Sequence, residues 1–110
     1  MATTYLSPQQ LKDFAQKVAE VAKNFPRGVV RIRYSFSRDW DGDPAIYFRV
    51  VLTDDARSLN RDQLGELTRR IRDSLVKALS LYDSEYSLYI PYFNYRTVSE
   101  QEQIKEPEWE

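Results

Sequence analysis

The chain has 110 residues, of which 42% are apolar and 30% are charged, and its net charge is −1 at neutral pH. These values fit a single globular domain and exclude a disordered or fibrous protein. The sequence contains no cysteine and no histidine, which excludes disulfides, thiolate metal sites and every catalytic arrangement that needs a Cys or His side chain.

The first predicted element is a helix that begins after Ser7. Ser7 and Gln10 have the spacing of a capping box, and Pro8 suits the first helical position. The helix is expected to end before Gly28, where "NFPRG" combines a helix-breaking proline with a glycine. Between these points the apolar residues recur every three or four positions and form one stripe: Leu11, Phe14, Ala15, Val18, Val21, Ala22 and Phe25.

From Val29 onward the apolar period changes to two, which is typical of strands with one buried face. A short polar segment with a glycine and a proline separates two such runs, so we predict an antiparallel hairpin. The apolar positions are Val30, Ile32, Tyr34 and Phe36 in the first run and Ile46, Phe48, Val50 and Leu52 in the second.

A second helix is predicted after Asn60, which can cap it together with Gln63. The segment "EYSLYIPYFNYR" then predicts a third strand, and Pro91 makes it an edge strand or a bulged one. The helix should bury Leu64, Leu67, Ile71, Leu75, Ala78 and Leu79. In the strand we expect Leu88, Ile90 and Tyr92 to share one side, and Tyr89, Pro91, Phe93 and Tyr95 the other.

The element order α-β-β-α-β predicts an α+β fold of two layers, with two helices on one face of a three-stranded sheet. We expect one domain over residues 1–96. Residues 97–110 hold five glutamates and one lysine, a net charge of −4, which leaves +3 for the domain. This composition predicts a loose acidic tail. Because the N-terminus lacks a signal-peptide pattern and no apolar run approaches the roughly 20 residues of a membrane span, we expect a cytoplasmic protein without membrane contacts.

Three aspartates in "SRDWDGDP" raise the question of a metal or catalytic site. A calcium loop that started at Asp39 would need glycine at its sixth position and an acid at its twelfth, where the chain has proline and valine. Asp41 and Asp43 have the Asp-x-Asp spacing of a magnesium-dependent nucleotidyltransferase, but the third strand supplies no further carboxylate. A hairpin turn is the preferred interpretation. We therefore expect no catalytic residue, no metal and no cofactor, with the magnesium enzyme as the minor alternative.

The sheet face that the helices do not cover is predicted to carry arginine and aromatic side chains. Such residues are enriched at protein–protein contacts, and they also bind single-stranded RNA by stacking on bases and holding phosphates. We expect this face to bind a partner protein or a second copy of the chain, with an RNA-binding accessory factor as the alternative. The predicted contact residues are Arg31, Arg33, Tyr47, Arg49, Tyr89, Phe93 and Tyr95.

Two resemblances bear on these predictions. The element order, with "AIYFRVVL" before a long helix and a last strand, resembles the KH-like ribosome-assembly factors in topology, although "SLYDSEYS" stands where that family has an Ala-x-Gly interruption. The segment "DWDGDPAIYFRVVL" is similar to small bacterial proteins of unassigned function. Proteins of that kind often act as one half of a two-protein system, such as a toxin and its antitoxin.

Overall fold

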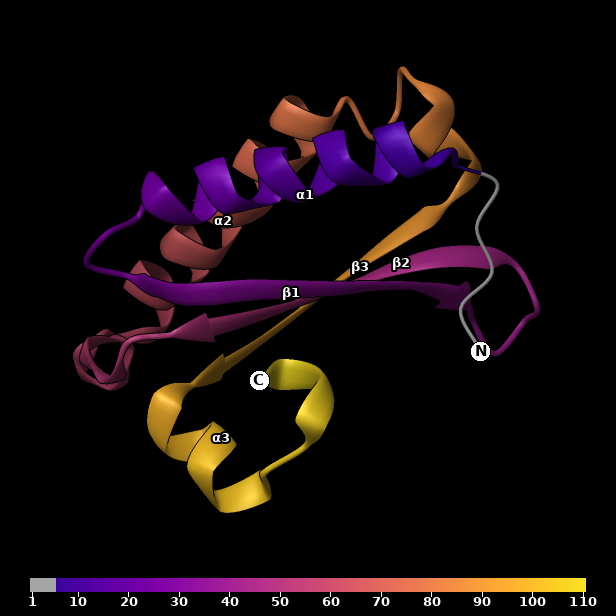
Figure 1. The fold of residues 1–110 in the computed structure, drawn as a ribbon. Helices are drawn as coiled ribbons and strands as arrows, with labels where there is room; N and C mark the ends of the chain where they lie inside the picture. The colour runs from indigo at the N-terminus through magenta and orange to yellow at the C-terminus, as the bar shows by residue number, and fades with distance from the viewer. Residues whose placement is uncertain (1–5) are drawn as a thin grey trace.

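The computed structural model describes residues 6–110. It packs two long helices, α1 (Pro8–Lys23) and α2 (Arg61–Leu79), on one face of a three-stranded sheet (Figure 1). This arrangement confirms the predicted α+β class and the placement of both helices on the same face. Residues 1–5, on which part of the signal-peptide prediction rests, lie outside the described range. Within residues 6–110, no helix has the length and apolar character needed to cross a bilayer.

Both long helices begin at the predicted capping boxes. The Gln10 backbone N–H donates to Ser7 Oγ at 3.1 Å, and the Ser7 N–H donates to Gln10 Oε1 at 2.8 Å. Asn60 and Gln63 exchange the same pair of bonds at the start of α2. These bonds satisfy N–H groups that a helix start otherwise leaves without a partner.

The hairpin consists of β1 (Val29–Arg38) and β2 (Pro44–Leu52), which pair antiparallel as predicted. The register departs from simple alternation at the start of β1. Val29 lies opposite Leu52 but Arg31 lies opposite Val51, so a bulge falls at Val30. At this bulge Val30 is 45% exposed, whereas Val29 is buried in the core.

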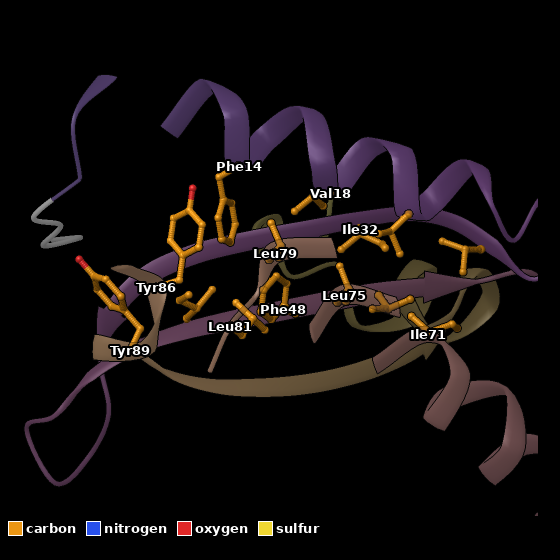
Figure 2. Close-up of a cluster of buried hydrophobic side chains, with 14 of the residues drawn as sticks. Phe14, Val18, Ile32, Phe48, Ile71, Leu75, Leu79, Leu81, Tyr86 and Tyr89 are labelled. Carbon is orange, nitrogen blue, oxygen red and sulfur yellow. The ribbon is translucent and has the colours of Figure 1, made fainter. Parts of the chain in front are cut away.

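The third strand, β3 (Ile90–Thr97), pairs parallel to β2, and the sheet order is β1-β2-β3. A parallel pair needs a crossover connection, which α2 provides. Pro91 therefore lies in an edge strand, as its missing N–H requires. The core fills the space between the helices and the sheet (Figure 2). At its centre the Phe14 ring lies 4.8 Å from the Tyr34 ring and 5.0 Å from the Tyr86 ring.

The prediction of a loose tail is wrong. Thr97 ends β3 and also caps α3 (Val98–Ile104), so no linker separates the tail from the sheet. A short 3-10 helix, η3 (Pro107–Trp109), follows, and the whole segment lies on the sheet face opposite α1 and α2 (Figure 1). The acidic composition of this segment predicted disorder. Composition does not reveal that Trp109 packs on the sheet, where only 6% of its surface is exposed.

Candidate interaction face on the sheet

The aspartate segment is a hairpin turn, as predicted. The Asp39 N–H donates to the Asp43 carbonyl at 2.8 Å, and Gly42 adopts a φ of 88° that favours glycine. Asp39 Oδ1 accepts the backbone N–H groups of Asp41 at 3.0 Å and Asp43 at 2.9 Å. Asp39 thus acts as the turn former. Across residues 6–110, no three acidic side chains gather closely enough to hold a metal ion.

The second oxygen of Asp39 ties this turn to β3. Tyr92 donates its hydroxyl to Asp39 Oδ2 at 2.8 Å, and only 7% of Asp39 is exposed. Burial opposes ionisation of Asp39, but the bonds from Tyr92 and from the backbone outweigh it and hold the pKa of the carboxyl below its ordinary value. The same bond, together with burial, raises the pKa of Tyr92 to about 12. The turn therefore positions a tyrosine of the sheet.

Strand register determines which side chains occupy the face away from the long helices. Arg33 pairs with Arg49 and Arg49 with Asn94, which places these three in one row across the sheet. The next row on one side is Ser35, Tyr47 and Tyr92, and the next row on the other side is Arg31, Val51 and Arg96. We call the nine residues of these three rows the sheet face.

Four of the seven predicted contact residues lie on the sheet face: Arg31, Arg33, Tyr47 and Arg49. The other three lie on the helix side. Tyr89 is buried, with its ring 5.2 Å from that of Phe36, and Phe93 stacks on Phe48 at 5.1 Å. Tyr95 donates its hydroxyl to the carbonyl of Thr68 in α2 at 3.0 Å.

The predicted sidedness of β3 is therefore reversed, and the residues that sequence reasoning missed are Tyr92, Asn94 and Arg96. The predicted sidedness would have turned Asn94 and Arg96 toward the core, where an amide and a guanidinium lose their water. The observed side buries the rings of Phe93 and Tyr95 instead. Asn94 between two aromatic residues was the available signal.

One row of the sheet face is covered by the chain's own C-terminal segment. The Arg96 guanidinium lies 4.2 Å from the centre of the Trp109 ring, and Arg31 Nε donates to the Trp109 carbonyl at 2.9 Å. Val51, between the two arginines, is fully buried. Arg31 also pairs with the Glu110 carboxylate at 3.1 Å, and Arg96 pairs with Glu106. Two arginines thus hold two glutamates and a tryptophan on the sheet.

Gln101 organises the inner side of this segment. Only 2% of it is exposed, and its Nε2 donates to the Glu106 carbonyl at 2.8 Å and to Glu110 Oε1 at 2.9 Å. Its Oε1 accepts from Arg96 Nη1 at 3.1 Å. One buried amide therefore joins α3, the C-terminal turn and β3.

Within residues 6–110, no hydrogen bond, ion pair or ring contact joins the other two rows to the C-terminal segment, and we call them the uncovered rows. Tyr47 and Tyr92 stack on each other, with ring centres 5.1 Å apart and planes 15° apart. Arg49 donates to Ser35 Oγ at 2.9 Å, and its guanidinium lies 5.7 Å from the Tyr47 ring. Arg33 is exposed, and neither Arg33 nor Arg49 forms an ion pair with any residue from 6 to 110. These two rows are cationic and aromatic.

The comparisons with known proteins add no family to this geometry. No family model matches the chain, and no curated protein or solved structure gives a significant match.

Proposed function

We propose that this protein is a non-enzymatic interaction module that binds a partner protein through the two uncovered rows of the sheet face. The partner segment is acidic and carries an aromatic side chain. The observation that carries the proposal is the covered row, where Arg31 and Arg96 bind the same chemistry in the chain's own tail: two glutamates and Trp109.

The uncovered rows repeat this chemistry, and the described part of the chain places no acidic side chain in an ion pair with them. Arg33 and Arg49 supply two positive charges, and the Tyr47–Tyr92 pair supplies an apolar surface with polar rims. Tyrosine and arginine dominate the binding energy of many protein interfaces. An acidic segment would neutralise two charges that form no ion pair within residues 6–110.

RNA binding suits this surface less well than protein binding. RNA-binding sheets use aromatic rings as platforms on which bases stack. Here Tyr47 and Tyr92 stack on each other, so each ring has one face already occupied. The tail also neutralises two of the four arginines on the sheet face.

The experiment compares two charge-matched variants of the full chain. Arg49→Glu with Asn94→Glu reverses the charge of the uncovered rows. Arg61→Glu with Gln9→Glu makes the same change in charge at exposed positions in the first turns of α2 and α1, where acidic residues are favoured. Each variant and the wild-type chain is used to capture partners from the native host with and without ribonuclease, and each captured protein is then purified and titrated against all three chains.

Support consists of a purified protein that binds the wild-type chain and the control but binds the sheet-face variant at least about tenfold more weakly, a loss of about 1.4 kcal/mol. Equal binding to all three chains contradicts the proposal. If ribonuclease treatment abolishes capture, the result would instead favour RNA as the ligand of the sheet face. A captured protein encoded beside this one would fit the expected two-protein system.

A further inference from the structure

The outer edge of β1 is open. The sheet order places β1 at one edge, paired only with β2, and its ten residues make it the longest strand. In residues 6–110, no backbone hydrogen bond joins the outer side of Val30–Arg38 to another segment. Alternate residues of an edge strand direct their N–H and C=O groups outward, where another strand can pair with them.

A groove runs beside this edge, between β1 and α1, with a volume of about 440 Å³. Its α1 wall carries small side chains, Ala15, Ala19 and Ala22, and its β1 wall carries Val30, Ile32 and Tyr34. Alanine on the helix leaves room above the strand that a larger side chain would fill. The groove therefore offers an apolar place next to unpaired backbone.

The charged side chains that line the groove are all cationic, although one of them, Arg31, pairs with Glu110. Lys23, Arg31 and Arg33 line it, and no carboxylate does. The acidic residues of α1, Asp13 and Glu20, are not among its lining residues, and Asp13 pairs with Lys17. Lys23 and Arg33 form no ion pair within the described part of the chain.

The geometry points to a strand-addition site: the edge of β1 and the groove beside it bind an extended segment of a partner protein in which apolar and acidic residues alternate. Side chains of an added strand point alternately to the two faces of the sheet. Those on the helix side enter the groove beside Ile32 and Tyr34, and those on the other side lie beside Arg31 and Arg33. Backbone pairing then supplies affinity and the alternation supplies specificity.

A second copy of this chain fits the site less well than an acidic segment does. Pairing two β1 strands would bring a second Arg31 and Arg33 to the same side of the same edge, and like charges on neighbouring strands destabilise a sheet. This site shares Arg31 and Arg33 with the sheet face, but it uses the open backbone edge and the groove and does not depend on the function proposed above.

The test uses an eight-residue capped peptide in which valine alternates with glutamate, titrated into the full chain and followed by backbone amide NMR. We expect saturable shifts over β1 and the facing side of α1, with slower hydrogen exchange at alternate β1 amides. Two control peptides should each bind at least about tenfold more weakly than the valine–glutamate peptide. In one, lysine replaces glutamate; in the other, alternate backbone nitrogens are methylated, so the peptide cannot pair as a strand.

Two variants locate the site. Ala19→Glu places a charge in the groove, and we expect it to weaken binding at least about tenfold. Gln16→Glu makes the same addition at an exposed α1 position that does not line the groove and should change binding less than about twofold. Asn94→Glu changes the sheet face on β3, two strands away from the edge of β1, so it should leave the peptide bound, which separates the outcome from that of the proposed function.

The proposal is overturned if the methylated peptide binds as tightly as the parent, or if Ala19→Glu binds normally. A dimer of the wild-type chain that Ala19→Glu dissociates also overturns it, because the occupant would then be a second copy. Circular dichroism and thermal unfolding establish that each variant is folded. If Ala19→Glu is unfolded, Ala19→Leu, which fills the same space without charge, replaces it under the same criteria.

Discussion

Both carboxylate oxygens of Asp39 are occupied, one by the backbone of its own turn and the other by the Tyr92 hydroxyl. This single side chain joins the β1–β2 turn to β3, the two parts of the sheet that are far apart in sequence. The link has a measurable dependence on pH, because the bond changes the proton affinity of both partners.

Stability should fall as the pH rises from 10 toward 12, in part because of Tyr92. Its pKa is raised from about 10 in an unfolded chain to about 12, so the folded state holds the proton more tightly. The resulting stabilisation is fully present below pH 10 and is lost as the pH approaches 12. Tyr92→Phe should therefore reduce the slope of unfolding free energy against pH in this window, measured with urea.

The matched control for this prediction is Tyr82→Phe, because Tyr82 is 63% exposed and lies outside the contact. Burial also raises the pKa of Tyr95 to about 12. Tyr95 therefore contributes to the dependence of unfolding free energy on pH in the wild type and in both variants. A Tyr92→Phe slope equal to that of the wild type would show that the Asp39 contact does not form in solution.

Ser80 ends α2 in the left-handed region, with φ of 48°. A side chain costs roughly 1–2 kcal/mol in this conformation, whereas glycine loses roughly 0.5–1 kcal/mol through its greater freedom in the unfolded chain. Ser80→Gly should therefore stabilise the protein by about 0.5–1 kcal/mol in chemical denaturation. Lys77→Gly, inside α2 at ordinary helical geometry, should destabilise it by a similar amount, and the prediction fails if both changes have the same sign.

At the scale of elements, the C-terminal segment behaves as a third layer over one end of the sheet. α3 is fixed to η1 (Asp54–Ser58) as well as to the sheet, because Ser99 donates to Asp54 through its hydroxyl at 2.6 Å and its N–H at 3.0 Å. These bonds from Ser99 hold the pKa of Asp54 below its ordinary value. The layer is thus attached at two places.

Trp109→Ala should detach this layer. The variant loses the buried ring that lies on Arg96, at a cost of about 3 kcal/mol, the low end for a buried tryptophan. A protease specific for glutamate should then cleave after Glu102 and Glu108 at least about tenfold faster. Ile104→Ala, at a position that is 53% exposed, is the control and should leave cleavage unchanged. Equal cleavage of both variants would show that Trp109 does not hold the segment.

The elements that could be predicted from the sequence are those with local signals. The capping boxes at Ser7 and Asn60 and the apolar stripes located both helices, and the change of period located the hairpin. Two features, the sidedness of β3 and the order of the C-terminal segment, depend on contacts between residues that are far apart in the sequence. The sidedness of β3 was decided by whether Phe93 or Tyr92 enters the core, and the order of the tail depended on where Trp109 is buried.

The candidate site shows the same limit. Strand alternation placed Arg31, Arg33, Tyr47 and Arg49 on the correct face because a hairpin fixes its own register. β3 joins the sheet through a crossover, so no turn fixes its register, and Tyr89, Phe93 and Tyr95 were placed on the wrong face. The groove beside β1 depends on which strand lies at the edge, and the hydrophobic pattern does not reveal strand order.

At the scale of the whole molecule, the tail carries a net charge of −4 and the remaining residues carry +3. The structure brings these charges together, because Glu106 and Glu110 pair with Arg96 and Arg31. The small net charge of the protein therefore conceals a cationic sheet face that its own tail partly neutralises.

Removing residues 98–110 should reveal this charge. The shortened chain should bind a twelve-residue oligouridylate at least about tenfold more tightly than the full chain at low salt. The logarithm of the affinity should fall against the logarithm of salt with a slope of about −2 to −3, as expected for four arginines on single-stranded RNA. Fluorescence anisotropy measures both quantities.

The control for the deletion keeps the tail in place. Glu106→Gln with Glu110→Gln removes the two negative charges that pair with Arg96 and Arg31 but leaves the Trp109 ring on Arg96, and it should give part of the gain. Adding Arg31→Ala and Arg96→Ala to the shortened chain should abolish the gain. If the shortened chain binds no better than the full one, the tail does not mask this charge.

The parallel pairing of β2 with β3 has a consequence for how the chain reaches its native state. β1 and β2 are joined by a short turn, but Ala45 and its partner Ile90 are 45 positions apart in the sequence, and such distant pairings form slowly. Until α2 delivers β3, the strand "PAIYFRVVL" has an unpaired edge, and five of its residues that are fully buried in the native state lie near that edge. Apolar strands with open edges are the segments from which aggregates grow. The segment most exposed to aggregation during folding is therefore β2, the most buried strand of the native sheet. Faster docking of α2, which brings β3 to that edge, should shorten this exposure.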